Sequence, residues 1–126
     1  MPIKRENAAK YPGGSIRSPE WLAIRDAVRE RAGDRCEECG ARHLAYGYRR
    51  GDGYFDDLGL DRGAAELRYI EIIPMTTERQ VGYFFRIVCT TAHVDNDLVD
   101  HSLDNLRFWC QRCHLGHDQA MRRAGK

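Results

Sequence analysis

Two cysteine pairs with the same spacing are the strongest chemical signal in this sequence. Cys36 and Cys39 stand in GDRCEECG, and Cys110 and Cys113 stand in WCQRCH. A structural zinc ion takes four thiolates in a tetrahedron, and each Cys-x2-Cys knuckle supplies two of them. We therefore predict one structural zinc site, although the 70 residues from 40 to 109 separate the two knuckles and the fold must bring them together.

Redox chemistry and local disulfides are the alternative uses of such pairs. A redox Cys-x2-Cys motif follows a strand of a βαβ unit, and the sequence shows no such alternation. The N-terminus, MPIKRENAAK, lacks the apolar segment of a signal peptide. We therefore expect a reducing, cytoplasmic location, where paired cysteines bind metal more often than they form disulfides. The fifth cysteine, Cys89, lies in an apolar run and is expected to be a buried core thiol.

A histidine, an asparagine and a second histidine accompany the second knuckle. His93 follows Thr90-Thr91-Ala92, Asn105 stands in LDNL, and His114 directly follows Cys113, with Asp118 four residues later. In order and spacing this pattern resembles the HNH endonuclease family over residues 34–40 and 85–120. The resemblance implies an α+β fold whose ββα-metal core, residues 84–124, cuts DNA with a divalent ion. It also implies that Asn105 ties the loop after the first strand of the motif.

The chemistry of phosphodiester hydrolysis fits the same residues. The reaction needs a nucleophilic water, a cation on the scissile phosphate and stabilisation of the leaving oxygen. Neutral imidazole is suited to take a proton from water near neutral pH, which makes His93 the candidate base. His114 and Asp118 are four residues apart on one predicted helix, with Cβ atoms about 6 Å apart. They are the candidate ligands of a catalytic Mg²⁺ or Mn²⁺ ion.

One position departs from the family pattern. Many HNH sequences carry an Asp or His before the general-base histidine as a further metal ligand, and here that position is Ala92. Three alternatives stay open: water completes the coordination, Asp95 or His117 contributes, or His93 is itself a ligand. His117 otherwise fits an exposed phosphate contact or no role. The remaining histidines, His43 and His101, stand in polar segments and are expected at the surface without a role.

A helix is expected between Ser18 and Gly33. Ser18 is a suitable N-cap residue, and Gly33 favours the backbone conformation that ends a helix. Trp21, Ile24 and Val28 recur at spacings of three and four residues, which predicts one buried face. The opposite face is basic.

The other segments are predicted from turn residues and β-branched runs. Residues 1–17 hold two prolines and a Gly-Gly pair, which predicts an arm rather than a packed element. Residues 41–83 are predicted to be an insertion, loop-rich to residue 68 with room for a short hairpin. The runs LRYIEII (67–73) and YFFRIVCT (83–90) predict strands, and residues 110–124 predict the final helix.

Length and charge limit the classes of function. The chain has 126 residues, which fits one small domain, and its longest segment without charge or glycine, Ile87 to Val94, is far too short to span a membrane. Residues 1–35 carry 8 basic and 5 acidic groups, residues 36–105 carry 7 and 13, and residues 106–126 carry 5 and 1. The basic ends suit a phosphate backbone. The predicted DNA contacts are Arg107, Arg112, Arg122 and Arg123, with Arg25 and Arg29 on the first helix.

Three functions are consistent with this sequence. The first is a metal-dependent HNH endonuclease acting on DNA, alone, as a homodimer or with a phage or defence-system partner. The second is a zinc-stabilised DNA-binding module whose site is inactive because of Ala92. The third is a small zinc-containing interaction domain, which explains the cysteines and leaves the His-Asn-His order to chance. We favour the enzyme because a pure binder has no need for both His93 and His114.

Overall fold

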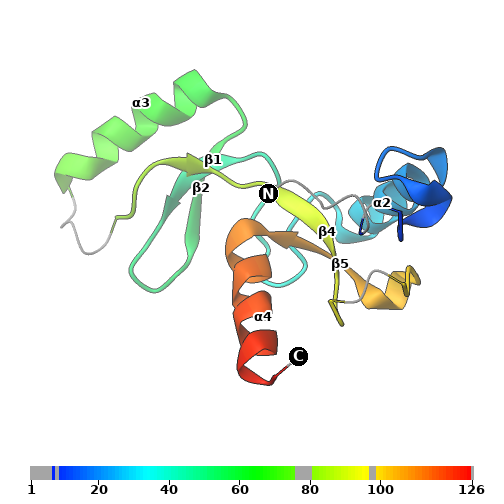
Figure 1. The fold of residues 1–126 in the computed structure, drawn as a ribbon. Helices are drawn as coiled ribbons and strands as arrows, with labels where there is room; N and C mark the ends of the chain where they lie inside the picture. Colours follow the sequence, from blue (N-terminus) through cyan, green and yellow to red (C-terminus); the bar gives the residue numbers. More distant parts are fainter. Residues whose placement is uncertain (1–6, 8, 76–80, 97–98, 126) are drawn as a thin grey trace.

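The computed structural model describes residues 7, 9–75, 81–96 and 99–125, and shows two small antiparallel sheets, the first with one helix packed against it and the second with two (Figure 1). This confirms the predicted α+β class. Among the described residues, every helix is too short or too polar to cross a lipid bilayer. The elements are α2 (Pro19–Ala32), β1 (Tyr46–Arg49), β2 (Phe55–Gly59), α3 (Arg62–Ile72), β3 (Phe85–Arg86), β4 (Cys89–His93), β5 (Leu106–Cys110) and α4 (Gln111–Arg123), with short 3₁₀ helices at Pro12–Gly14, Ile73–Met75 and Leu103–Asn105.

The first long helix, α2, agrees with its prediction at both ends. The Ser18 hydroxyl accepts a hydrogen bond from the Trp21 N–H at 3.1 Å, and Gly33 ends the helix in the left-handed conformation with φ of 64°. Trp21 and Val28 are buried in the main core. The residue pattern therefore defined both the extent of the helix and its buried face.

The segment before α2 is more structured than the predicted arm. The Tyr11 ring packs edge-on against Trp21 with ring centroids 4.7 Å apart, and Ile16 packs against the main core. The Ser18 hydroxyl also donates a hydrogen bond to the carbonyl of Pro12. Two apolar side chains are thus enough to hold this segment against α2, so the prediction of an unpacked arm is wrong for these residues. Residues 1–6 and 8 of that arm lie outside the described residues.

The second sheet is a hairpin of β4 and β5 that contributes six buried residues to the main core. Its register runs from Cys89 opposite Cys110 to His93 opposite Leu106. Both α2 and α4 pack against this hairpin. Because side chains alternate between the faces of a strand, Leu106 and Phe108 share one face and Trp109 lies on the other. The final helix begins at Gln111, with Cys110 as its N-cap, as predicted to within one residue.

The run 83–90 was predicted as one strand and forms parts of two. Strand β3 pairs with β1 in the first sheet, whereas β4 pairs with β5 in the second. Between them, the Ile87 N–H donates to the Ala45 carbonyl at 2.8 Å, and the Val88 N–H donates to the side chain of Gln111 at 3.1 Å. The chain crosses from one sheet to the other at the fully buried Ile87, so one apolar run serves both.

Within the predicted insertion, β1 and β2 form a hairpin with α3 packed on it, and β3, which follows the insertion, adds to β1 to give the strand order β2-β1-β3. The predicted short hairpin is confirmed, but the predicted strand 67–73 is wrong, because residues 67–72 belong to α3 and Ile73 begins the next 3₁₀ helix. The Asp61 side chain caps this helix by accepting from the Ala64 N–H at 2.9 Å. Ala65, Tyr69 and Ile72 then recur at helical spacing and face the small second core.

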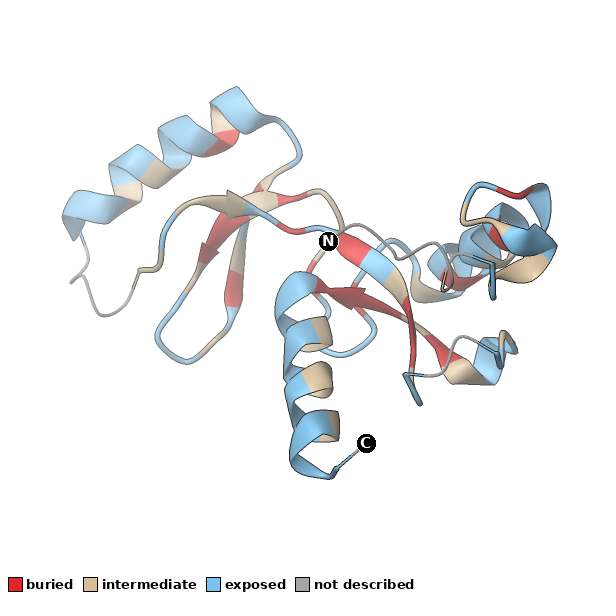
Figure 2. Cartoon of the chain, viewed as in Figure 1, coloured by how far each residue is buried: buried red, intermediate tan, exposed pale blue. Residues whose placement is uncertain are grey.

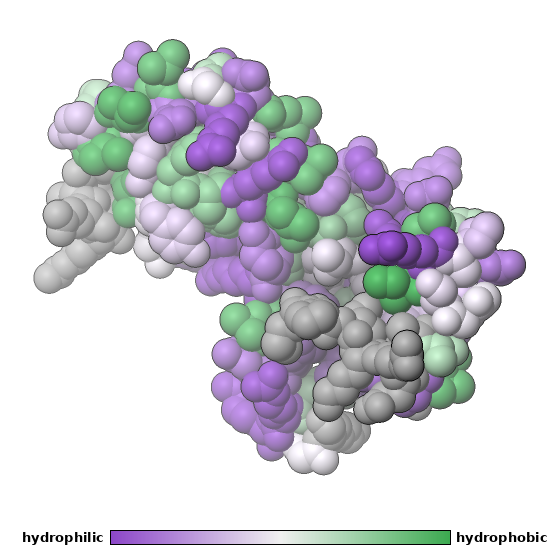
Figure 3. All heavy atoms as spheres, turned by 45° about the horizontal axis from the view of Figure 1, so that its top comes forward, coloured by the Kyte–Doolittle hydropathy of each residue, from purple (hydrophilic) through white to green (hydrophobic). Residues whose placement is uncertain are grey.

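Much of α3 faces solvent (Figure 2). Hydrophobic side chains gather on its outer surface (Figure 3), where Leu67 is 65% and Ile70 is 55% exposed. These exposed residues gave the run LRYIEII its apolar, strand-like character. The helical spacing is instead visible in the residues that face the second core, which are Ala65, Tyr69 and Ile72.

Candidate metal centre and histidine cluster

The four predicted zinc ligands come together in the structure. The Sγ atoms of Cys36, Cys39, Cys110 and Cys113 all lie within 4.8 Å of one another, and those of Cys39 and Cys110 are 3.8 Å apart. Four sulfur atoms around a zinc ion, each at about 2.3 Å, are about 3.8 Å apart. The cluster therefore fits a tetrahedral metal ion such as zinc. Within the described part of the chain, no other group of three or more His, Cys, Asp or Glu side chains is close enough to hold a metal.

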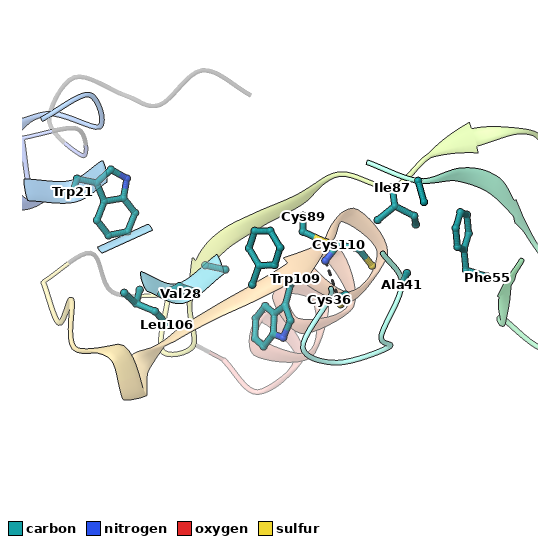
Figure 4. Close-up of a cluster of buried hydrophobic side chains, with 13 residues drawn as sticks. Trp21, Val28, Cys36, Ala41, Phe55, Ile87, Cys89, Leu106, Trp109 and Cys110 are labelled. Atoms are coloured by element: carbon teal, nitrogen blue, oxygen red, sulfur yellow. Dashed lines mark hydrogen bonds between the residues drawn. The ribbon is translucent and has the colours of Figure 1, made fainter. Parts of the chain in front are cut away.

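Hydrogen bonds between the first knuckle and β5 close the long gap in the sequence. The Glu37 N–H donates to the Phe108 carbonyl at 2.8 Å, and the Phe108 N–H donates to the Glu37 carboxylate at 2.8 Å. The Cys110 N–H donates to the sulfur of Cys36 at 3.3 Å (Figure 4). The Gly40 N–H donates to the Cys36 carbonyl at 2.9 Å, and Gly40 has a φ of 78°, so the first knuckle closes in a tight turn.

The electrostatics of the cluster favour a bound cation. Hydrogen bonds from Cys110 and Cys36 lower the pKa of Cys39, while hydrogen bonds with Cys36 and Cys39 raise the pKa of Cys110. Four thiolates at this spacing repel one another unless a cation lies between them. The fifth cysteine differs, since burial raises the pKa of Cys89 to about 12 and keeps it a neutral thiol. Its predicted place in the core is confirmed.

His93 ends β4 and is buried, with 5% of its surface exposed. Its ring stacks on Trp21, with centroids 5.8 Å apart and planes 8° from parallel. Its Nε2 atom lies 3.0 Å from Nδ1 of His101, and the Nε2 atom of His101 lies 2.8 Å from the Lys10 carbonyl. Tyr11 contacts both imidazole rings.

These contacts correct two predictions about isolated histidines. His101 was expected at the surface without a role, yet it is half-buried and hydrogen-bonded to His93. His43 was expected there too, yet it is half-buried, and its Nδ1 atom accepts from the Cys89 N–H at 3.0 Å. Both histidines stand in polar sequence segments, and for this reason they were expected at the surface. The neighbouring residues in the sequence do not reveal the partners that other parts of the chain contribute.

Helix α4 carries the other predicted site residues. The His114 Nε2 and Asp118 Oδ2 atoms are 3.7 Å apart, both on partly exposed side chains. His117, expected to be exposed, is half-buried: its Nε2 atom donates to the Val94 carbonyl at 2.6 Å and its ring lies against Trp109. This hydrogen bond holds α4 against the end of β4.

The His93 ring and the α4 pair lie on opposite faces of the hairpin. The His93 ring packs against α2, whereas His114 packs against Trp109 on the other face. Because side chains alternate along a strand, Ala92 shares the α4 face. Ala92 is buried there and offers no ligand atom. A further ligand at residue 92 would have joined the His114 side of the hairpin.

Asn105 links the two ends of the loop between β4 and β5. Its amide nitrogen donates to the Asp95 carboxylate at 3.1 Å and to the Asp100 carbonyl at 2.8 Å. Its own carbonyl accepts from the Val94 N–H at 2.8 Å. Through these three hydrogen bonds, Asn105 holds the loop after His93 in place.

The predicted DNA-binding arginines fall into two groups. Arg122 and Arg123 are exposed at the end of α4. Arg112 donates to the Gly53 carbonyl at 3.0 Å and Arg107 to the Asp104 carbonyl at 3.0 Å, so both also have contacts within the protein. Arg31 of α2 donates to the carbonyls of residues 103 and 106 and so joins α2 to β5.

Sequence reasoning did not identify Arg49 as part of the metal centre. Its guanidinium lies 3.4 Å from the sulfur of Cys110 and 4.0 Å from that of Cys39. Arg49 belongs to β1, so the insertion contributes directly to the surroundings of the cysteines. No sequence spacing relates Arg49 to either knuckle.

A cavity of about 270 Å³ lies beside the aromatic residues that contact His93 and His101. Tyr11 and Trp21 line it, together with Arg25, Thr91 and Phe108. It therefore has aromatic walls, and both basic and acidic side chains, Arg25 and Asp26 among them, line it on the same face of the hairpin as His93.

No protein-family profile, curated protein or solved structure matches this chain significantly.

Proposed function

We propose that this protein is a metal-dependent endonuclease that hydrolyses DNA phosphodiester bonds. The observation that carries the proposal is the position of His93, which ends β4 with its ring stacked on Trp21 and its Nε2 atom 3.0 Å from Nδ1 of His101. Trp21, Tyr11 and His101 hold this buried imidazole in place. A zinc-stabilised module that only binds DNA has no need for such a histidine. The resemblance of the His-Asn-His pattern to HNH endonucleases supports the same conclusion.

In the proposed reaction His93 acts as the general base. It takes a proton from water, and the water oxygen uses its freed electron pair to form a bond to phosphorus. The phosphorus–oxygen bond to the leaving sugar oxygen then breaks, and that oxygen keeps the electron pair and takes a proton from solvent. Stacking on Trp21 and the contact with His101 hold the imidazole in place, which limits the entropy lost on reaching the reactive geometry.

His114 and Asp118 would hold the catalytic divalent ion. Two side chains suffice for Mg²⁺, which keeps several waters when it binds to proteins. The ion would supply positive charge to the scissile phosphate and to the leaving oxygen. We assign the four-cysteine cluster no part in the reaction, because a closed set of four sulfur ligands is typical of a structural zinc site.

A second candidate function is binding of DNA without cleavage. It is favoured by Ala92, which leaves the α4 face of β4 without a ligand, and by the absence of a three-residue ligand cluster other than the cysteines in the described segments. The exposed Arg122 and Arg123 would serve this function equally well. Only an activity measurement separates the two candidates.

The deciding experiment is cleavage of supercoiled plasmid DNA over a range of Mn²⁺ and Mg²⁺ concentrations. We expect the wild-type protein to cut, and His93→Ala to lose about 10²–10⁴-fold in rate at every metal concentration while it keeps its zinc and its affinity for DNA. His114→Ala should regain part of its rate at high Mn²⁺, because a lost ligand weakens ion binding. Gln119→Ala, an exposed change on the same helix, serves as the control.

Two results would overturn this assignment. DNA binding without any metal-dependent cleavage would favour the binding module. Recovery of His93→Ala by added metal, together with weaker ion binding by calorimetry, would make His93 a ligand and leave the base to another residue.

A further inference from the structure

The cavity of about 270 Å³ lies between α2, the β4–β5 hairpin and the segment before α2, on the face of the hairpin that carries His93. Tyr11, Trp21 and Phe108 form aromatic walls, and Thr91 lines the cavity from β4. Its volume lies just below the range of pockets that enclose drug-sized ligands. One flat ring of the size of a nucleobase is therefore a suitable occupant, whereas a larger ligand is not.

The charges around the cavity balance, which argues against a phosphate or a carboxylate as its occupant. Among the described residues, the charged side chains that line it are Arg25, Asp26 and Arg29. Arg29 is paired with the carboxylate of Asp34, so Arg25 and Asp26 balance each other. Burial lowers the pKa of His43, which also lines the cavity, so this imidazole is neutral at pH 7. An uncharged polar ring fits this balance better than an anion.

The same side chains offer the hydrogen-bonding groups that the edge of a base requires. The Arg25 guanidinium can donate and the Asp26 carboxylate can accept. Nδ1 of His43 accepts from the Cys89 N–H at 3.0 Å, so the neutral ring carries its proton on Nε2 and is a donor there. Proteins recognise an unstacked base by aromatic stacking together with hydrogen bonds to its edge. The cavity combines both kinds of group.

Trp21 lies between the cavity and His93. Its indole lines the cavity and stacks on the His93 ring with planes 8° apart. Thr91 stands two residues before His93 on the same face of β4, so their Cα atoms are about 7 Å apart. A base and the phosphate of its own nucleotide are separated by one sugar, which is a similar span. A strand with one base in the cavity would therefore bring its backbone to His93.

We propose that this cavity binds one unpaired nucleobase of a DNA strand, next to the phosphodiester bond that is cut. The proposal rests on the proposed function, because His93 marks the reacting end of the strand. A paired base must first leave its stack, and this costs least in a single strand or at a mismatch. The substrate class is therefore DNA with an unpaired base at the cleavage site, as in single strands, gaps and mismatches.

The first measurement is binding without added Mg²⁺ or Mn²⁺, by fluorescence anisotropy with end-labelled strands. We expect a short strand of deoxyadenosine to bind about 10-fold more tightly than an abasic strand of the same length. Tyr11→Ala should remove this preference, and Tyr11→Phe should keep it because the ring still stacks. Equal affinity of the wild-type protein for the two strands would overturn the proposal. Free deoxyadenosine binding as tightly as the strand would make the cavity a nucleoside site and would overturn it too.

Arg25 provides a second test, because its exposed side chain can be removed without disturbing the core. Arg25→Ala should reduce the preference for the strand with bases over the abasic strand. Arg17→Ala is the matched control, since it removes the same charge from an exposed position before α2. The same change in both variants would mean that charge alone is read, which contradicts recognition of a base.

Crosslinking locates the base without relying on a variant. Ultraviolet light should join a strand that contains 4-thiothymidine to Tyr11, Trp21 or Phe108, and mass spectrometry of the digested protein identifies the residue. Crosslinks found only at Tyr54 or Tyr83, which are exposed aromatic residues elsewhere on the protein, would contradict the proposal.

Cleavage under saturating Mn²⁺ connects the cavity to the reaction. We expect single strands and mismatched duplexes to be cut about 10-fold faster than a matched duplex, and Tyr11→Ala to lose most of this difference. Equal rates on all three substrates would overturn the assignment of an unpaired base to the cleavage site. If no DNA is cut, the proposed function fails, while binding and crosslinking still decide whether the cavity takes a base.

Discussion

The guanidinium of Arg49 lies 3.4 Å from the sulfur of Cys110, although 60 residues, 50–109, separate them in the sequence. Arg49 also donates to the Gly53 carbonyl at 2.9 Å and lies over the Phe55 ring at 5.9 Å, so the hairpin of the insertion holds its position. Four thiolates around one Zn²⁺ carry a net charge of −2, which a neighbouring guanidinium offsets. Arg49 therefore links the insertion to the stability of the metal centre.

Removal of this charge should weaken the hold on zinc. We expect Arg49→Ala to lose zinc to a chromogenic chelator about 10-fold faster than wild type, and Arg49→Lys to show a smaller increase. The control is Arg50→Ala, because Arg50 is the next residue of the same hairpin and pairs with Asp56 instead of the cysteines. Equal rates in Arg49→Ala and Arg50→Ala would mean that the effect comes from the hairpin and not from the charge.

Loss of a zinc ligand should unfold the main core. A structural zinc site contributes on the order of 10 kcal/mol to folding in small domains, so Cys110→Ser should aggregate or melt far below the wild-type temperature. Elemental analysis should find one zinc per wild-type chain. Cys89→Ala is the matched control, because it removes a buried thiol outside the cluster and should keep the full zinc content. A zinc-free wild-type protein with the same melting temperature as Cys110→Ser would refute the site.

The C-terminal arginines should contribute to DNA affinity through phosphate contacts. Replacing both Arg122 and Arg123 by Ala should weaken binding and reduce the slope of log affinity against log salt by about 2, one for each lost contact. Arg62→Ala, an exposed change on α3, provides the comparison. The measurement is fluorescence anisotropy with duplex DNA over a series of salt concentrations, and an unchanged slope would exclude the end of α4 from the interface.

The second core should weaken at alkaline pH because of Tyr48. Burial, together with the hydrogen bond that its hydroxyl donates to Asp56, raises the pKa of Tyr48 above its ordinary value of 10.0. The protonated phenol therefore stabilises the fold fully below pH 10, and this contribution is lost as the pH rises through the higher pKa of the folded state.

Tyr48→Phe should lower stability at pH 7 by about 1 kcal/mol and remove part of the decline above pH 10. Melting temperatures measured between pH 7 and pH 11 check both effects. Tyr54→Phe is the control, since Tyr54 is 60% exposed. A parallel decline in all three proteins would show that Tyr48 does not titrate with unfolding.

The sequence by itself determined the features that depend on short spacings. Ser18 and Gly33 bound α2 because capping depends on a residue and its immediate neighbours. The two Cys-x2-Cys knuckles predicted a four-sulfur cluster, because a structural zinc ion binds four thiolates and each knuckle supplies two of them. The α+β class and the final helix followed from local patterns of the same kind.

The tertiary structure decided the features that depend on distant partners. The run LRYIEII became part of a helix because Asp61 caps it and because Ala65 packs against the hairpin of the insertion. His101 became a partner of His93 because the loop between β4 and β5 returns to the segment that contains Lys10. Arg49 reached the cysteines because β1 lies beside the second knuckle. Polar and charged side chains of these types are common on surfaces, and only the three-dimensional path of the chain distinguishes those that meet a partner from those that meet water.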